Sequence, residues 1–189
     1  LDSAIAMQHE MIRFNQDRVA KGFQEIRAGI GIHCGHLMLG TIGAADRMEG
    51  TVISDAVNLA ARMEGLTKFY GAGILITEHV MMRLPDPTRY LLRTLERVRV
   101  KGKSSAVSVI EVLDGYANCE LYSASRPEFD RGMHSYLNRE FKEAADLFRA
   151  VLVQNPGDGA SKILLNRAIE HQNRGVGADW EGIIDMDAK

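Results

Sequence analysis

The hydrophobic pattern of this chain changes its period near Gly115, and this change limits the possible folds more than any other feature of the sequence. Before Gly115, short runs of branched aliphatic residues alternate with glycine-containing turns and with longer helix-like stretches. After Pro127, apolar residues recur at spacings of three and four, which is typical of helices that bury one face. The sequence therefore predicts a unit of strands and helices followed by a smaller helical unit.

The part of the chain before Gly115 contains the signals of several short strands and two longer helices. The first helix is expected up to about Lys21 and should stop at Gly22. Two strands at 26–33 and 37–42 are close enough to form a hairpin around a turn. The other elements are expected in this order: a loop at 43–50, a strand at 51–53, a helix from Ser54 or Asp55 to about Lys68, a strand at 74–77, a short helix, and two strands at 90–100 and 107–112.

In this pattern helices are combined with hairpins, which favours an α+β fold over a doubly wound α/β fold. Gly29 and Gly31 lie within an expected strand. They lack the order of strand, glycine-rich turn and helix that a phosphate-binding loop requires. Close packing of the strand is therefore the better explanation for these glycines.

The polar stretch at 116–126 is interpreted as a linker between a sheet-containing domain at 1–115 and a helical appendage at 127–189. One set of residues in the appendage has offsets that resemble a single tetratricopeptide unit. Because one helix pair cannot bury its own face, the appendage is expected to dock on the preceding sheet or on an upstream segment. The set is Gly132, Ala144, Phe148 and Pro156.

Charge, cysteine content and hydropathy exclude several classes of function. The formal net charge is −2 and the isoelectric point is near 6.3, so no bulk attraction to nucleic acid or anionic lipid is expected. No apolar run approaches the roughly 20 residues that span a bilayer, and Cys34 and Cys119 are too few for a disulfide framework. A cytoplasmic location is therefore expected. The chain begins at Leu1 without an initiator methionine or a signal peptide, which we interpret as a piece of a longer protein.

Asn58 and Arg62 have the spacing of a binding site. Four residues apart on a helix, they project from the same face, near small alanine side chains that leave room for a ligand. A guanidinium suits phosphate because its planar fork donates two parallel hydrogen bonds. Spacing alone leaves an alternative open, in which Arg62 pairs with Glu64 or Asp55 on a solvated helix.

A series of short motifs runs from Arg27 to Tyr70: Gly29-Ile-Gly-Ile-His33, Gly40-Thr-Ile-Gly43, Asp46-Arg47, Thr51-Val-Ile53, Asp55-Ala-Val-Asn58-Leu-Ala-Ala-Arg62 and Glu64-Gly65. In order and spacing these motifs resemble the catalytic domain of class III nucleotidyl cyclases, the adenylate and guanylate cyclases. The similarity continues through 98–103 to about Val112. It implies a truncated class III cyclase fold, with a sheet derived from the ferredoxin-like βαββαβ arrangement, followed by the helical appendage.

The resemblance implies a role for each of four residues. Asn58 would orient the ribose, and Arg62 would neutralise charge on the phosphates as the 3′-hydroxyl attacks the α-phosphate. Lys101 would contact the polyphosphate, with Lys103 as a weaker candidate and an exposed hairpin turn as the alternative for both. Thr51 would read the purine edge, and its surroundings resemble a Thr-bearing subset of bacterial adenylyl cyclases, which favours ATP. Because a hydroxyl both donates and accepts hydrogen bonds, GTP and an ordinary strand residue remain alternatives at Thr51.

The resemblance also implies two Mg²⁺ or Mn²⁺ ions, whose carboxylate ligands in this family lie in an earlier strand and hairpin, upstream of Leu1. No metal ligand is therefore assigned in this chain. Cyclase domains associate head to tail, so Asn58 and Arg62 would complete a site whose metals a second cyclase domain holds. These expectations describe part of an adenylate cyclase that converts ATP to 3′,5′-cyclic AMP and pyrophosphate, inactive as this piece alone. The alternatives are a non-catalytic cyclase-like scaffold, whose appendage recruits a protein partner, and a guanylate cyclase.

Overall fold

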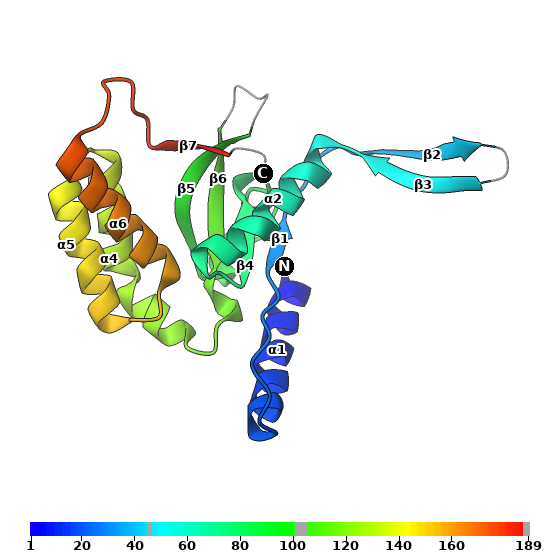
Figure 1. Cartoon of the computed structure of the whole chain (residues 1–189), viewed down its shortest axis with the longest axis horizontal. Coiled ribbons are helices and arrows are strands. Elements are labelled where there is room, and N and C mark those ends of the chain that lie inside the picture. The colour runs from blue at the N-terminus through cyan, green and yellow to red at the C-terminus, as the bar shows by residue number, and fades with distance from the viewer. Residues whose placement is uncertain (45–46, 101–105, 187–189) are drawn as a thin grey trace.

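The computed structural model describes residues 1–44, 47–100 and 106–186 of the chain. In this part of the chain, one five-stranded sheet carries the helices and a separate two-stranded sheet projects from it (Figure 1). In chain order the elements are α1 (Asp2–Ala20), β1 (Ile30–Ile32), β2 (Met38–Ala44), β3 (Arg47–Ile53), α2 (Asp55–Tyr70), β4 (Ile74–Thr77), α3 (Glu78–Met81), the 3₁₀ turn η1 (Pro87–Arg89), β5 (Leu92–Val100), β6 (Ala106–Val112), the 3₁₀ turn η2 (Leu113–Gly115), α4 (Cys119–Leu137), α5 (Phe141–Gln154), α6 (Gly159–Arg174) and β7 (Ile183–Met186).

The five-stranded sheet has the order β1-β4-β6-β5-β7. Its centre is antiparallel, because β6 pairs antiparallel with both β4 and β5. At one edge β1 pairs in parallel with β4, and α2 lies between these two strands in the chain, as the crossover helix that a parallel pair requires. The α+β fold class is confirmed, as are the strands predicted at 74–77, 90–100 and 107–112.

The hairpin predicted between 26–33 and 37–42 is wrong. β1 pairs with β4, whereas β2 pairs antiparallel with β3. The loop predicted at 43–50 is wrong for the same reason, because residues 43, 44 and 47–50 belong to the paired strands β2 and β3. An alternating pattern predicts a strand but not its partner, and the glycines around β1 suit it to lie under a helix.

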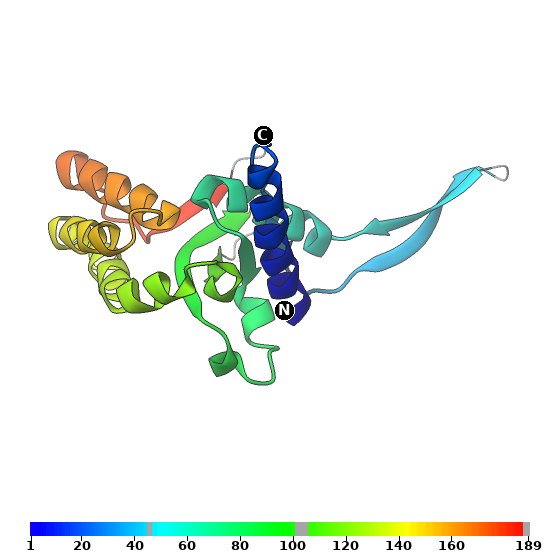
Figure 2. The same cartoon turned by 90° about the horizontal axis from the view of Figure 1, so that it is seen from below.

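The β2–β3 hairpin extends away from the five-stranded sheet, on the side opposite helices α4, α5 and α6 (Figures 1 and 2). Three apolar side chains at its base are exposed. They are Leu37, Met38 and Leu39.

The predicted first helix is confirmed as α1, which ends at Ala20 just before Gly22 takes a left-handed φ of +78°. Its apolar face is only partly covered. Ala4 is buried, whereas Met7 is 56% exposed and Phe14 is 50% exposed. The sequence therefore predicted the helix correctly, although the described residues cover only part of its apolar side.

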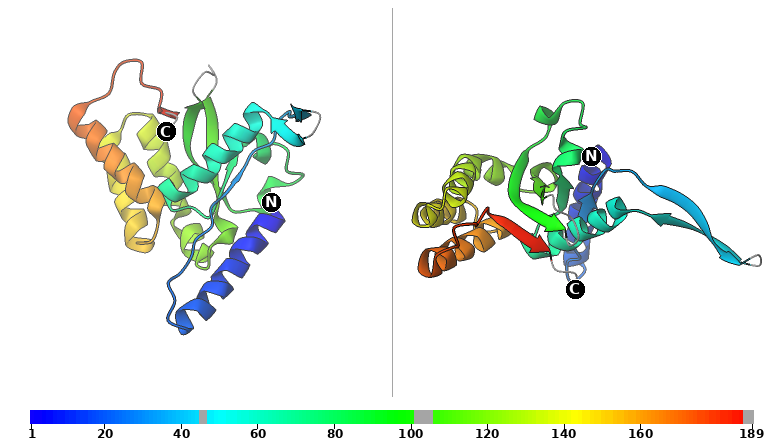
Figure 3. Two further views of the ribbon diagram at one scale, coloured as in Figure 1. Left: turned by 45° about the vertical axis from the view of Figure 1, so that its right-hand side comes forward. Right: turned by 90° about the horizontal axis from the view of Figure 1, so that it is seen from above.

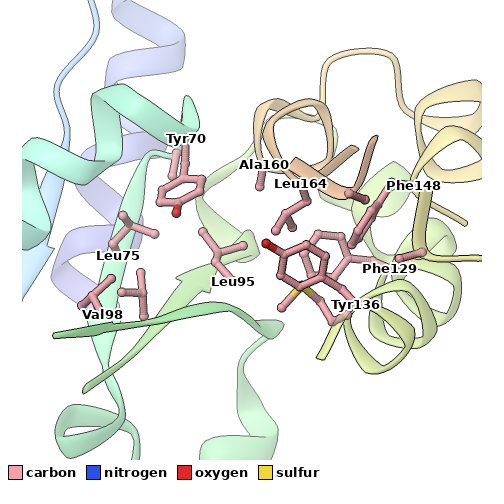
Figure 4. Close-up of a cluster of buried hydrophobic side chains, with 14 of the residues drawn as sticks. Tyr70, Leu75, Leu95, Val98, Phe129, Tyr136, Phe148, Ala160 and Leu164 are labelled. Atoms are coloured by element: carbon pink, nitrogen blue, oxygen red, sulfur yellow. The ribbon is translucent and has the colours of Figure 1, made fainter. Parts of the chain in front are cut away.

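Two hydrophobic clusters lie on opposite faces of the five-stranded sheet. The larger one packs side chains of β4, β5 and β6 against α2 and against α4, α5 and α6 (Figure 4). The smaller one packs Ile74, Ile76 and Ile110 against Ala4 of α1. Leu75 lies between Ile74 and Ile76 but belongs to the larger cluster, as the alternation of a strand requires.

The polar stretch at 116–126 is turn-like only at 116–118. α4 begins at Cys119 and continues through this stretch, with Pro127 inside the helix. The polar composition was misleading because Tyr122 and Ser125 are buried on the inner face of α4. Ser125 donates its hydroxyl to the Leu121 carbonyl at 2.8 Å, which satisfies the polar group inside the helix.

The helical segment has three helices, and its predicted docking on the sheet is confirmed by the hydrophobic cluster that they share with it. Within it, Gly132 of α4 lies against Phe148 of α5. A Cβ atom at Gly132 would lie 2.9 Å from the Phe148 ring, so a larger residue would separate the two helices. The resemblance to a tetratricopeptide unit stays a prediction.

A buried ion-pair network fastens α6 to the sheet. Arg93 of β5 donates to Glu111 of β6 at 2.7 Å and, through its two terminal nitrogens, to Asp158 at 2.6 and 2.8 Å. All three side chains are at most 1% exposed. Asp158 also caps α6, because it accepts from the backbone N–H of Ser161 at 3.1 Å. The Arg93 guanidinium lies 4.2 Å from the centroid of the Phe129 ring, so α4 covers the network.

The C-terminal tail, which showed no regular pattern in the sequence, adds the edge strand β7 beside β5. Trp180 lies in a group of rings with centroids 5.4 Å from both Tyr136 and Phe141. Arg99 of β5 pairs with Asp185 of β7 at 3.2 Å. These contacts return the tail from the helices to the sheet.

Candidate active site

α2 begins directly after β3 and carries two of the four predicted site residues. The Ser54 hydroxyl accepts from the Ala56 backbone N–H at 3.0 Å and donates to the His36 carbonyl at 2.6 Å. Ser54 is therefore the N-cap, as one of the two predicted alternatives had it. The helix ends at Tyr70, slightly later than predicted, because Gly71 takes the left-handed φ of +67° that terminates helices.

Glycine places α2 in direct contact with β1. A Cβ atom at Gly31 would lie 2.1 Å from the Glu64 backbone nitrogen and 2.6 Å from the Ala60 carbonyl oxygen. A Cβ atom at Gly29 would lie 1.8 Å from the hydroxyl oxygen of Thr67. The expectation that these glycines serve strand packing is confirmed. They fix how α2 lies on the sheet, and hence the direction of its exposed side chains.

Replacing Gly31 with alanine is expected to lower the free energy of unfolding by about 2–3 kcal/mol, because the added methyl group must push α2 away from β1. Urea denaturation followed by circular dichroism measures this change. The matched control is Gly65→Ala in α2, where an added Cβ meets nothing within 4 Å. That control should raise stability by about 0.5–1 kcal/mol through helix propensity. Equal stabilities for the two variants would contradict the close contact.

Asn58 and Arg62 lie one helical turn apart on α2, beside the stripe that the helix buries. Asn58 is exposed and Arg62 is half-buried. The Nη1 atom of Arg62 is buried, and no hydrogen-bond partner for it is found among the described residues. This atom therefore makes no hydrogen bond with Glu64 in the described part of the chain, whereas one form of the alternative on a solvated helix required that contact. A buried guanidinium N–H without an acceptor is costly, and a phosphate oxygen would satisfy it.

The other two predicted site residues, Thr51 and Lys101, do not lie on α2. The backbone of Thr51 lies in β3 opposite Gly40, three residues before the N-cap Ser54, so Thr51 precedes the start of α2 closely in the chain. Lys101 and Lys103 lie outside the described residues. The structure therefore brings Asn58 and Arg62 together on α2 and joins Thr51 to them through the chain.

The described residues do not fit a metal site: within 1–44, 47–100 and 106–186, no group of three or more His, Cys, Asp or Glu side chains could hold an ion. Nucleophilic chemistry is not indicated at Cys34 either, since its thiol donates to the His79 carbonyl at 3.1 Å. In the same part of the chain, no helix has the length and apolar character needed to cross a membrane.

Comparison with known proteins gives consistent matches. The sequence model of the family described as "Adenylate and Guanylate cyclase catalytic domain" matches residues 1–113. The adenylate cyclase of Anabaena cylindrica is 47% identical over 117 residues, which are 59% of this chain and 23% of that protein. The terminal-differentiation-specific adenylate cyclase of Dictyostelium discoideum is 35% identical over 152 residues, 79% of this chain and 7% of that protein. A solved structure, the adenylyl cyclase CyaB from P. aeruginosa, is 32% identical with a TM-score of 0.48, covering 57% of this chain and 54% of that one.

The chain spans less than a quarter of the length of these two curated relatives. The match to the Dictyostelium protein covers 79% of the chain, so that similarity reaches past residue 113 into the helical segment. The family model itself covers more than half of the chain. The chain therefore belongs to the adenylate and guanylate cyclase catalytic domain family.

Proposed function

We propose that this chain is part of an adenylate cyclase and supplies the residues that handle the purine, the ribose and the transition state. The observation that carries the proposal is the buried Nη1 atom of Arg62, which has no acceptor among the described residues and lies one turn from Asn58. An ordinary surface arginine would be solvated or paired. The names of the Anabaena and Dictyostelium relatives support cyclic AMP as the product.

The proposed reaction is an in-line displacement. The 3′-hydroxyl oxygen of ATP bonds to the α-phosphorus and loses its proton to water, while the bond from that phosphorus to the bridging oxygen breaks and releases pyrophosphate. Negative charge increases on the phosphate oxygens in the transition state. Arg62 donates hydrogen bonds to those oxygens, and Asn58 holds the ribose so that its 3′-oxygen is in line.

The substrate contacts of Thr51 and Lys101 belong to the same proposal. Thr51 reads the purine edge and favours adenine, and Lys101 binds the polyphosphate. Among the described residues of this chain, no group of three or more His, Cys, Asp or Glu side chains could hold the family's Mg²⁺ or Mn²⁺ ions. We therefore assign their carboxylates to another segment or to a second cyclase domain, arranged head to tail with this one in a homodimer.

The division into a catalytic part at 1–115, a junction at 116–126 and a helical appendage at 127–189 is also a proposal. We also propose that the appendage is tetratricopeptide-like, that it binds a protein partner, and that the protein is cytoplasmic. In support of the division, the family model ends at residue 113, close to the proposed boundary. The junction itself is helical from Cys119 onward.

The first experiment assays the purified 189-residue chain with ATP and Mn²⁺. No cyclic AMP above the background is expected, because the described residues of this chain hold no metal site. A complete cyclase domain that contains this chain should form cyclic AMP under the same conditions. Robust turnover by the chain alone would refute the assignment of the essential carboxylates elsewhere, and an inactive complete domain would favour a non-catalytic scaffold.

The second experiment tests the base. Thr51 alone leaves adenine and guanine open, so ATP and GTP should compete in the complete domain. We expect kcat/KM for ATP to exceed that for GTP by about tenfold or more, on the scale of a polar group that is left unpaired by the wrong base. The reverse preference would assign the chain to a guanylate cyclase.

A further inference from the structure

α6 is attached to the five-stranded sheet at two points along its length. At its N-cap, Asp158 joins it to Arg93 of β5. Farther along, Arg167 donates to Glu96 of β5 at 2.5 Å, with both side chains mostly buried. At a rise of about 1.5 Å per residue, these attachments are roughly 14 Å apart, so α6 is held against β5 as a rod fixed at two places.

The C-terminal end of α2 lies against this fixed helix (Figure 3). A Cβ atom at Gly159, the first residue of α6, would lie 2.2 Å from the Tyr70 carbonyl oxygen, so the two backbones touch. The Arg167 guanidinium lies 5.5 Å from the centroid of the Phe69 ring. Arg167 therefore contacts the sheet through Glu96 and the helix α2 through Phe69.

These contacts complete the placement of α2. Its middle rests on β1 at Gly31, and its C-terminal end rests on α6 at Tyr70 and Phe69. The packed stripe between them includes Met63 and Tyr70, at most 1% exposed. A helix held at both places cannot rotate or tilt without breaking one of the two contacts. Asn58 and Arg62 lie on α2, so their positions depend on how α2 is held.

We propose that Arg167 is a positioning residue for Asn58 and Arg62, and that the helical appendage holds the candidate catalytic helix through it. The proposal rests on the proposed function, since it assigns Asn58 and Arg62 to the reaction. It also makes the appendage part of the site's support rather than a separate module. Small shifts matter in such a site, because a misplacement of about 1 Å costs about 10²-fold in rate.

The first test measures amide hydrogen exchange in the intact 189-residue chain by mass spectrometry. Arg167→Leu removes the contacts of Arg167 with Glu96 and with Phe69. Phe69→Ala removes only the contact between Phe69 and Arg167, and the Phe69 side chain is 51% exposed. The control Arg174→Leu lies on the same helix and loses one exposed pair with Glu170. Relative to the control, both test variants should exchange about fivefold faster in 55–63, with unchanged exchange in α1 and α5.

The second test measures turnover in the complete cyclase domain. Arg167→Leu and Phe69→Ala should lower kcat by about tenfold with little change in KM for ATP, and Arg167→Lys should restore part of the loss because it keeps a cation beside Glu96. Exchange in 55–63 equal to that of Arg174→Leu, or faster exchange spread over the whole chain, would overturn the proposal. If Arg62→Ala leaves kcat unchanged, the proposed function fails instead, and the exchange result still decides whether α6 holds α2.

Discussion

Replacing Arg62 with alanine is expected to lower kcat of a complete cyclase domain that contains this chain by about 10²-fold, the effect of removing one donor to a developing oxyanion. The Nη1 atom of Arg62 is buried and lacks an acceptor among the described residues, so its N–H is available to a phosphate oxygen. That hydrogen bond strengthens as charge develops in the transition state, so KM for ATP should change much less than kcat. Initial rates of cyclic AMP formation over a range of ATP concentrations separate the two.

Two variants control this experiment. Lys68→Ala removes an exposed cation from the last turn of the same helix and should leave kcat within about twofold. Arg62→Lys keeps the charge but loses the planar fork, so its kcat should fall between those of the wild-type and alanine forms. Equal kcat values for Arg62→Ala and Lys68→Ala would remove Arg62 from the mechanism.

Local signals in the sequence were sufficient for much of the fold. Ser54 before an apolar helical pattern predicted the start of α2, and Gly22 predicted the end of α1, because caps act within a few residues. Local sequence was also sufficient to predict that two candidate site residues lie together. Asn58 and Arg62 share a face of one helix, so their proximity needs only the helical period.

Strand pairing was not predictable in the same way. β1 had a nearby strand pattern at 37–42, yet it pairs in parallel with β4, more than 40 residues away in the chain. The deciding contact is between Gly31 and the backbone of α2, where a Cβ would lie 2.1 Å from the Glu64 nitrogen. A glycine in the sequence does not reveal which backbone approaches it.

The buried ion pairs that join α6 to β5 could not be predicted from the sequence either. Arg93 and Glu96 stand in a strand that looks amphipathic, and their charges suggest solvent. The structure buries both, because Asp158 and Arg167 arrive from a helix more than 60 residues later. A charge at an inward-facing strand position was the only available signal, and it did not identify the partner.

Replacing Arg93 with methionine is expected to lower the free energy of unfolding by about 3–5 kcal/mol at pH 7, because it leaves two carboxylates buried without their cation. Glu111 and Asp158 are at most 1% exposed and both depend on Arg93. Burial raises the pKa of Asp158, but the hydrogen bonds and charge of Arg93, together with the hydrogen bonds from Ser161, outweigh burial and hold that pKa below its ordinary value. Burial also raises the pKa of Glu111, which Arg93 offsets only in part.

The sign of the pH dependence follows from these directions. With Arg93 present, the lowered pKa of Asp158 contributes stability above its unfolded pKa, about 3.9, and this contribution is lost as pH falls through the folded pKa. The raised pKa of Glu111 acts oppositely and costs stability as pH rises through its folded value. Without Arg93 the pKa of each carboxyl group is expected to rise, so the variant should lose stability relative to the wild-type chain as pH rises from about 4 towards 7. The difference in the free energy of unfolding between Arg93→Met and the wild-type chain should therefore be larger at pH 7 than at pH 5.

Urea denaturation at both pH values, followed by circular dichroism, measures the difference. Arg126→Met is the matched control, because its partner Asp130 lies 3.3 Å away on the exposed side of α4, and it should change stability by no more than about 0.5 kcal/mol. Adding Glu111→Gln and Asp158→Asn to Arg93→Met should recover part of the loss, since no unpaired charge stays buried and asparagine can still cap α6. A loss in Arg93→Met no greater than in Arg126→Met, at either pH, would mean that the network does not hold the helices on the sheet.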